Sequence, residues 1–137
     1  MLRKDGKIEL LKKVPLFSQC SKKQLAAIAS LADLIDLPEG AVLIREGARG
    51  RECMVIVEGE VEVRRKGRKI NSLGPGDFIG EMALISGAPR NATVSTTRDS
   101  SLLVVTERQF WELLERTPRM QTSVIKALGE RLQSLAV

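Results

Sequence analysis

The residues most suited to chemistry lie in the segment 76–94, which reads GDFIGEMALISGAPRNATV. Its centre, residues 81–86, suits a single helical turn, because methionine, alanine and leucine favour helix. Backbone N–H groups at such a turn lack partners within the helix, and they attract anions such as phosphate. Arg90 follows a few residues later, and its planar guanidinium matches the geometry of phosphate oxygens. The segment is therefore predicted to bind a phosphate group.

Glu81 stands beside this predicted anion site, where another negative charge is unfavourable. The carboxylate becomes favourable there if it accepts a hydrogen bond from a sugar hydroxyl. Gly80, just before it, lets a ligand approach the backbone closely. Phosphate and a sugar hydroxyl together predict a nucleotide ligand. Two simpler interpretations stay open, in which Glu81 caps its own turn and Arg90 is an ordinary surface residue.

The elements that position this segment fall into three zones, and the first and last are helical. Residues 1–30 are expected to be helical, and Ser21 with Gln24 has the spacing of a capping box. Residues 107–135 are also expected to be helical, with a second capping box at Thr106 and a helix that starts at Pro118. The final helix carries an apolar stripe formed by Met120, Val124, Leu128, Leu132 and Leu135.

The middle zone, residues 31–106, is expected to contain short strands separated by turns. Val61 and Val63 alternate with charged residues, which is typical of a half-buried strand, and Gly67 marks a tight turn. Strands of this length and spacing predict a sandwich or a small β-barrel with helices at both ends. No linker divides the three zones, and 137 residues suit one domain.

The segment 79–94 resembles the phosphate-binding cassette of the cyclic nucleotide-binding domain family. The family pattern is F-G-E-hydrophobic-A-L followed by P-R-x-A-T/S-V, and this chain has IGEMAL at 79–84 and PRNATV at 89–94. Ile79 takes the usual aromatic position. The resemblance implies a mainly β fold, an eight-stranded β-roll of the jelly-roll type with N-terminal helices, a short cassette helix and two C-terminal helices. It also implies a single domain over 1–137, with the cassette inside the β region and the output helices at 107–135.

The resemblance assigns a role to each residue of the cassette. Glu81 would accept the ribose 2′-hydroxyl, Arg90 would pair with the cyclic phosphate, and the N–H groups of Ala83 and Ala92 would face that phosphate. Asn91 occupies the position that influences the choice of base, and it leaves cAMP or cGMP open, with cAMP preferred. The full predicted ligand-binding set is Ile79, Gly80, Glu81, Met82, Ala83, Arg90, Asn91 and Ala92.

Several apolar residues have a structural and a ligand-binding interpretation. Ile79, Val61 and Val63 could line the base pocket, although a place in the core is preferred for each. Met82 and Leu84 are expected in the core. Trp111 is expected to pack between helices rather than to stack on adenine.

The implied function is a non-catalytic regulatory domain that binds a cyclic nucleotide and relays binding through its C-terminal helix, which caps the base in this family. The ligand would be cAMP or cGMP, with no cofactor and no metal, and an effector domain or protein would be the partner. Two alternatives remain. One is an interaction module of the same fold without ligand, although Glu81 and Arg90 are both intact. The other is a basic nucleic-acid or anionic-lipid binder that uses residues 64–69.

Composition restricts the classes of function further. The chain lacks histidine, which excludes Ser-His triads and histidine metal sites, and no constellation suggests an enzyme. Cys20 and Cys53 lack metal-site spacing and are expected as reduced thiols of a cytoplasmic protein. The net charge of +5 favours anionic partners, but the run at 64–69 is interpreted as a solvated hairpin tip because aromatics make up only 3% of the chain. Neither a signal peptide nor a membrane span is expected, and no sequence-specific DNA binding is expected without a helix-turn-helix segment.

Overall fold

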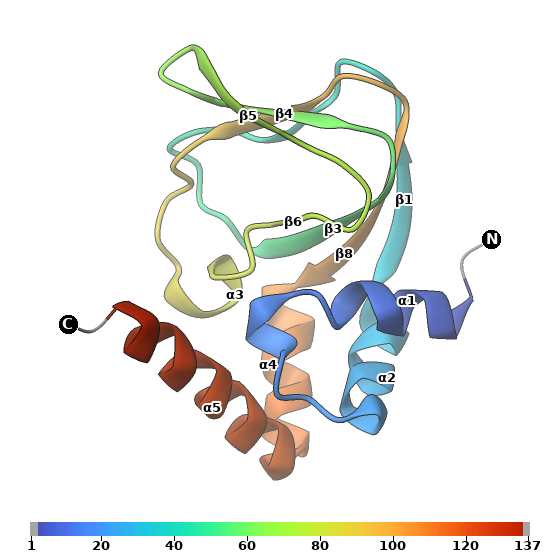
Figure 1. The fold of residues 1–137 in the computed structure, drawn as a ribbon, viewed down its shortest axis with the longest axis vertical. Coiled ribbons are helices and arrows are strands. Elements are labelled where there is room, and N and C mark those ends of the chain that lie inside the picture. The colour runs from blue at the N-terminus through green and yellow to red at the C-terminus, as the bar shows by residue number, and fades with distance from the viewer. Residues whose placement is uncertain (1–2, 136–137) are drawn as a thin grey trace.

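The computed structural model describes residues 3–135 and contains two β-sheets above a group of helices (Figure 1). The helices are α1 (Lys4–Leu11), the 3-10 helix η1 (Pro15–Phe17), α2 (Lys22–Leu31), α3 (Ala83–Ser86), α4 (Glu107–Arg116) and α5 (Pro118–Leu135). The strands are β1 (Asp33–Leu37), β2 (Val42–Ile44), β3 (Glu52–Glu58), β4 (Val61–Arg65), β5 (Arg68–Leu73), β6 (Phe78–Ile79), β7 (Thr93–Thr96) and β8 (Ser100–Thr106).

The strands form two antiparallel four-stranded sheets with the orders β1-β8-β3-β6 and β2-β7-β4-β5. This arrangement confirms the predicted eight-stranded jelly-roll fold with flanking helices. Among the described residues the two hydrogen-bonded ladders stay separate, so the strands form a roll of two sheets rather than a closed barrel. The prediction of a small β-barrel is therefore corrected, because the described strands form an open roll of two sheets.

The strands β3 and β8 have both faces buried, which explains their continuous apolar runs. Met54 and Ile56 face the other sheet, where they pack against Val61. The alternate residues of β3, including Val55, pack against the helices. The helical side of this core contains Phe17 and Phe110, whose rings lie 5.8 Å apart between centroids, so the helices and this sheet share one core.

Local signals set the starts of the helices. The Ser21 side chain accepts a hydrogen bond from Gln24 N, and the Gln24 side chain accepts one from Ser21 N, so the predicted capping box is confirmed. At α4, the Thr106 side chain accepts a hydrogen bond from Gln109 N, but the Gln109 side chain accepts from the Thr106 hydroxyl and not from Thr106 N, so the cap is present and the predicted box is incomplete. Helix α5 begins at Pro118, as predicted.

The apolar stripe of α5 is only partly used in packing. Met120 and Val124 are buried and Leu128 is half-buried, but Leu132 is 70% exposed. The buried part of the stripe therefore ends before Leu132. The side chain of Leu135 lies outside what the structure describes.

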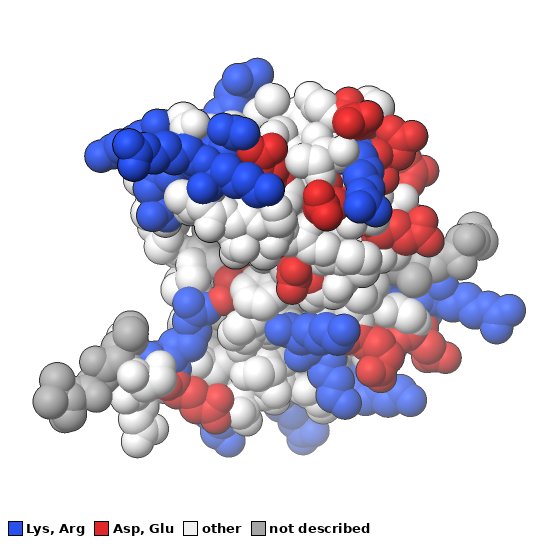
Figure 2. Space-filling view, turned by 45° about the horizontal axis from the view of Figure 1, so that its top comes forward, with Lys and Arg blue, Asp and Glu red and all other residues white. Residues whose placement is uncertain are grey.

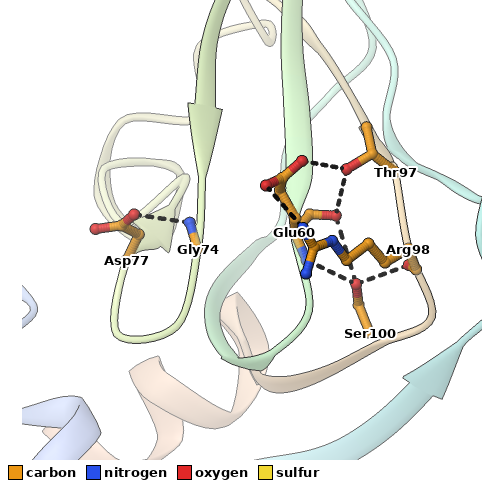
Figure 3. Close-up of polar contacts among 6 residues, drawn as sticks. All are labelled: Glu60, Gly74, Asp77, Thr97, Arg98 and Ser100. Carbon is orange, nitrogen blue, oxygen red and sulfur yellow. Dashed lines mark hydrogen bonds and ion pairs between the residues drawn. The ribbon is translucent and has the colours of Figure 1, made fainter.

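Hydrogen bonds connect the β3–β4 turn to the β7–β8 turn (Figure 3). The Glu60 carbonyl accepts a hydrogen bond from Thr97 N at 2.9 Å, and the Thr97 hydroxyl donates to the Glu60 carboxylate at 2.8 Å. Gly59 has a φ of +100°, and a Cβ there would lie 2.1 Å from Ser100 Oγ. Glycine is therefore required at this turn, where the two sheets meet.

Candidate functional site

The cassette connects β6 to β7 through the short helix α3. Gly80 has a φ of +72°, and Gly87 ends α3 with a φ of +64°. Both values lie in the left-handed region that glycine adopts without strain. The predicted single helical turn is confirmed, and its two flanking glycines return the chain toward Arg90.

Arg90 lies folded against the backbone of two glycines. A Cβ on Gly80 would lie 1.9 Å from Arg90 Nη1, and a Cβ on Gly50 would lie 2.1 Å from Arg90 Nε. Arg90 Nη2 donates to the carbonyl oxygen of Glu52 at 2.7 Å. The space over Gly80, expected to admit a ligand, therefore holds the arginine itself.

The electrostatic state of Arg90 follows from this partly buried position. Burial lowers the pKa of the Arg90 guanidinium from its ordinary value, while Glu52 and Cys53 act in the opposite direction. An arginine keeps its proton at neutral pH even after such a shift. Arg90 therefore supplies a positive charge that is partly removed from solvent.

Glu81 is buried and its carboxylate connects the cassette to both helical ends of the chain. Oε2 accepts a hydrogen bond from Leu16 N at 2.8 Å, and Oε1 accepts one from Arg131 Nη1 on α5. The carboxylate therefore does not cap its own turn. Sequence reasoning missed both partners, because they lie 65 and 50 residues away along the chain.

Two adjoining cavities meet at Gly80, Arg90 and Asn91. We call the first the cassette cavity; it has a volume of about 340 Å³. The second, the inter-sheet cavity, has about 280 Å³. The cassette cavity is lined by Gly80, Glu81, Met82, Ala83, Ser86, Ala88, Pro89, Arg90, Asn91 and Arg131. The inter-sheet cavity is lined by Ile44, Val63, Ile70, Asn71, Leu73, Phe78, Ile79, Gly80, Arg90, Asn91, Ala92 and Val94.

All eight predicted ligand-binding residues line one or both of these cavities. Met82 is half-buried and borders the cassette cavity, whereas Leu84 is fully buried in the core as expected. Ile79 and Val63 border the inter-sheet cavity, and Val61 belongs to the core. The predicted set did not include Ile44, Ile70, Asn71, Leu73, Phe78 and Val94 of the inter-sheet cavity. The β4–β5 hairpin pairs Val61 with Leu73 and Val63 with Asn71, but the register shift between Val63 and Arg64 is not visible in the sequence spacing.

The backbone N–H groups of the cassette differ in availability. Ala83 N donates to the Gly80 carbonyl oxygen at 3.0 Å, so this predicted phosphate donor is engaged within the turn. Between residues 3 and 135, the N–H groups of Met82 and Ala92 donate to no protein acceptor. These two groups therefore keep a donor without a protein partner, and their residues line the cassette cavity and the inter-sheet cavity respectively.

Trp111 packs on the cassette helix and borders neither cavity. Its indole Nε1 donates to the Leu84 carbonyl oxygen at 2.9 Å, and its ring meets Phe110 edge-on with centroids 6.2 Å apart. The packing interpretation is confirmed, although 41% of the residue stays exposed. A cavity of about 600 Å³ opens on the far side of Trp111, between the β2–β3 loop and the start of α4. Exposed arginines and neighbouring glutamates line this cavity. None of the eight residues predicted to bind ligand is among its lining residues.

Comparisons with known proteins agree with this geometry. The family model described as "Cyclic nucleotide-binding domain" matches residues 34–117. A cyclic nucleotide-gated potassium channel of Rhizobium etli is 38% identical over 90% of this chain, and a cAMP-dependent protein kinase regulatory subunit of Mycosarcoma maydis is 40% identical over 77%. The chain spans 34% and 22% of these two relatives. The solved N-terminal domain of a transcriptional regulator from Streptomyces coelicolor A3(2) has a TM-score of 0.84 and 28% identity, covering 92% of this chain and 94% of that one.

Among residues 3–135, no helix has the length and apolar character needed to cross a membrane. In the same part of the chain, no group of three or more histidine, cysteine, aspartate or glutamate side chains is placed to hold a metal ion.

Proposed function

Because the chain belongs to the cyclic nucleotide-binding domain family, we propose that residues 1–137 act as one regulatory domain whose two adjoining cavities hold a cyclic nucleotide. The observation that carries this proposal is the meeting of a polar and a mainly apolar cavity at Arg90. A cyclic nucleotide has the same division, since its phosphate and ribose are polar and its base is flat and largely apolar. The cassette cavity would take the phosphate and ribose, and the inter-sheet cavity would take the base.

The phosphate would lie where the two cavities meet. Arg90 supplies the positive charge there, and Met82 and Ala92, whose N–H groups have no protein acceptor among the described residues, line the cassette cavity and the inter-sheet cavity respectively. Charge-assisted hydrogen bonds to phosphate are about twice as strong as neutral ones. The Glu81 carboxylate borders the cassette cavity and has lone pairs beyond those used by Leu16 and Arg131, so it can also accept a ribose hydroxyl.

We propose cAMP rather than cGMP as the preferred ligand. Among the residues that the structure describes, Asn71 and Asn91 are the only ones besides Arg90 that bring polar side chains to the inter-sheet cavity. Guanine carries more exocyclic polar groups than adenine, and a buried polar group without a partner is costly. The 40% identity with a cAMP-dependent protein kinase regulatory subunit supports the same choice.

Helix α5 would relay binding through the contact between Arg131 and Glu81. Arg131 also borders the cassette cavity, so its positive charge offsets the negative charge of Glu81 beside the incoming phosphate. Ligand and docked helix would then stabilise one another, because both use the same carboxylate. In the resembled family the final helix caps the base, but here α5 borders the ribose side through Arg131 and contributes no residue to the inter-sheet cavity.

The output would reach an effector domain or protein, as the names of the channel and kinase relatives suggest. Cyclic nucleotide-binding domains are regulatory and non-catalytic, and we propose the same for this chain. The two cysteines are free, which suits the reducing environment of the cytoplasm as the proposed location.

Isothermal titration calorimetry of the purified chain with cAMP and cGMP tests the proposal. Arg90→Ala should weaken cAMP binding at least tenfold while the protein stays folded, and Arg90→Lys should recover only part of the loss. Arg98→Ala, which removes the same charge from an exposed turn, is the matched control. If neither nucleotide binds the wild-type chain at millimolar concentration, the domain is an interaction module without ligand.

The role of Glu81 is tested with 2′-deoxy-cAMP. The wild-type chain should bind this analogue much more weakly than cAMP, whereas Glu81→Ala should distinguish the two ligands only slightly. A double-mutant cycle measures the coupling. Equal losses in both proteins would assign Glu81 a structural role alone.

A further inference from the structure

The β4–β5 hairpin carries the most concentrated positive charge in the sequence. Its tip is a two-residue turn, in which Lys66 and Gly67 have φ values of +52° and +79°. We define the basic tip by the cations Arg64, Arg65, Lys66, Arg68 and Lys69. The hairpin projects from the sheet in Figure 1, and Figure 2 shows the corresponding cluster of blue side chains at the upper left, with acidic side chains gathered mainly on the opposite side.

Contacts within the protein neutralise only part of this charge. Arg64 pairs with Glu62 and also donates to the Gly67 carbonyl oxygen at 3.1 Å. Arg65 Nε donates to the Asn91 carbonyl oxygen at 2.9 Å, which leaves its charge without a counterion. Within residues 3–135, the side chains of Lys66, Arg68 and Lys69 pair with no carboxylate. The Glu46 carboxylate also lies at this turn, where it accepts a hydrogen bond from Lys66 N at 2.9 Å. With Glu62 and Glu46 against five cations, the basic tip keeps a net positive charge for a partner.

An exposed apolar side chain lies directly beside these cations. The register of β4 and β5 shifts between Val63 and Arg64, which leaves Ile70 as an extra residue on β5. Ile70 borders the mouth of the inter-sheet cavity, and 48% of it remains exposed. Cations around an exposed apolar residue match the headgroup region of an anionic bilayer, where charges meet lipid phosphates and the apolar group enters the acyl boundary.

Nucleic acid matches the same surface less well. Single strands bind through aromatic side chains on which bases stack, and residues 61–73 of the hairpin contain none. We infer that the basic tip together with Ile70 binds the anionic surface of a phospholipid membrane peripherally, which goes beyond the proposed nucleotide binding.

Vesicle co-sedimentation of the full chain tests this inference. We expect binding to vesicles of phosphatidylcholine mixed with phosphatidylserine, no binding to phosphatidylcholine alone, and weaker binding as salt screens the charges. Lys66→Glu, Arg68→Glu and Lys69→Glu together should abolish binding, because each lost cation alone is expected to weaken it about fivefold. Ile70→Ser should weaken binding several-fold while its salt dependence stays the same.

The matched control reverses Lys12, Lys22 and Lys23, which changes the net charge by the same amount on the N-terminal helices. This control variant should still bind the anionic vesicles, and thermal melting should show that both charge-reversed proteins fold. Equal loss in the two variants would show that net charge, not the basic tip, drives binding and would overturn the inference. Two other results would also overturn it: no binding to anionic vesicles at low salt, or tighter binding to polyuridylate or duplex DNA than to the vesicles. Nucleotide titration of the wild-type chain and of the two charge-reversed variants, whose substituted residues line neither cavity, reports separately on the proposed function.

Discussion

Replacing Arg131 with alanine tests the link between the site and the final helix. In the wild-type chain the Arg131 guanidinium donates to the Glu81 carboxylate, and it borders the cavity proposed for phosphate and ribose. The substitution removes the charge partner of a buried carboxylate and one positive charge from the cavity. It should therefore lower the free energy of unfolding, weaken cAMP binding and loosen α5 together.

The size of the effect follows from the exposure of the two side chains. The Arg131 side chain is 42% exposed and that of Glu81 is 7% exposed. Breaking a fully buried pair costs about 3–5 kcal/mol, and an exposed pair contributes about 0.2–1 kcal/mol. A half-exposed pair should fall between these limits, at about 2 kcal/mol of unfolding free energy, which lowers Tm by roughly 6–10 °C for a domain of this size.

Calorimetry with cAMP and amide hydrogen exchange measure the other two effects. We expect a loss of affinity of about tenfold, which corresponds to about 1.4 kcal/mol. We also expect cAMP to slow exchange in α5 of the wild-type chain but not of Arg131→Ala. Arg119→Ala removes the same charge from the exposed start of α5 and is the matched control. Wild-type affinity and unchanged protection of α5 in Arg131→Ala would refute the proposed coupling.

Three other changes test separate parts of the structure. Gly50→Ala places a Cβ 2.1 Å from Arg90 Nε, so it should displace the guanidinium. Calorimetry should then show cAMP binding weakened about as much as in Arg90→Ala. Unchanged affinity would contradict the assigned position of Arg90. Ser21→Ala removes the side-chain acceptor of the capping box and should cost about 1 kcal/mol, seen as a Tm lowered by roughly 4 °C; an unchanged Tm would mean that the box contributes nothing. Burial, and then the Glu81 charge, raises the pKa of the Cys53 thiol from 9.0 to about 12. As the pH rises, the unfolded chain therefore loses this proton before the folded protein does. The free energy of unfolding should fall as pH rises from about 9 toward 12. The slope reaches about 1.4 kcal/mol per pH unit for this thiol, and urea unfolding of Cys53→Ala over the same pH range should show a shallower slope; equal slopes would contradict the assignment.

The parts of the site that could be predicted are those encoded in short stretches of sequence. The cassette combines a turn-forming glycine, a helical turn and an arginine within a few residues, and all eight residues predicted from it border the two cavities. The capping box at Ser21 is equally local, and it is present. Such features depend on backbone geometry over one or two turns, so sequence spacing is sufficient to find them.

The parts that could not be predicted depend on how distant elements pack. Nothing in the spacing of Leu16, Glu81 and Arg131 indicates that they meet, because the contact depends on where two helices lie relative to the cassette. Leu132 shows the same limit for packing. Helical periodicity places it on the apolar face of α5, but periodicity says nothing about whether a partner covers that face, and Leu132 is exposed.

The two contacts of Glu81 also show that the segment matched by the family model is shorter than the segment that must fold together. The family match covers residues 34–117, whereas the partners of this carboxylate, Leu16 and Arg131, lie on either side of that range. A protein trimmed to the matched residues would keep the whole cassette but lose both partners of this carboxylate, and it would expose the apolar surface that the removed helices cover, which is destabilising. The helices outside the match therefore belong to the folding unit as much as the strands do, and domain exchange between relatives should cut the chain beyond both of them.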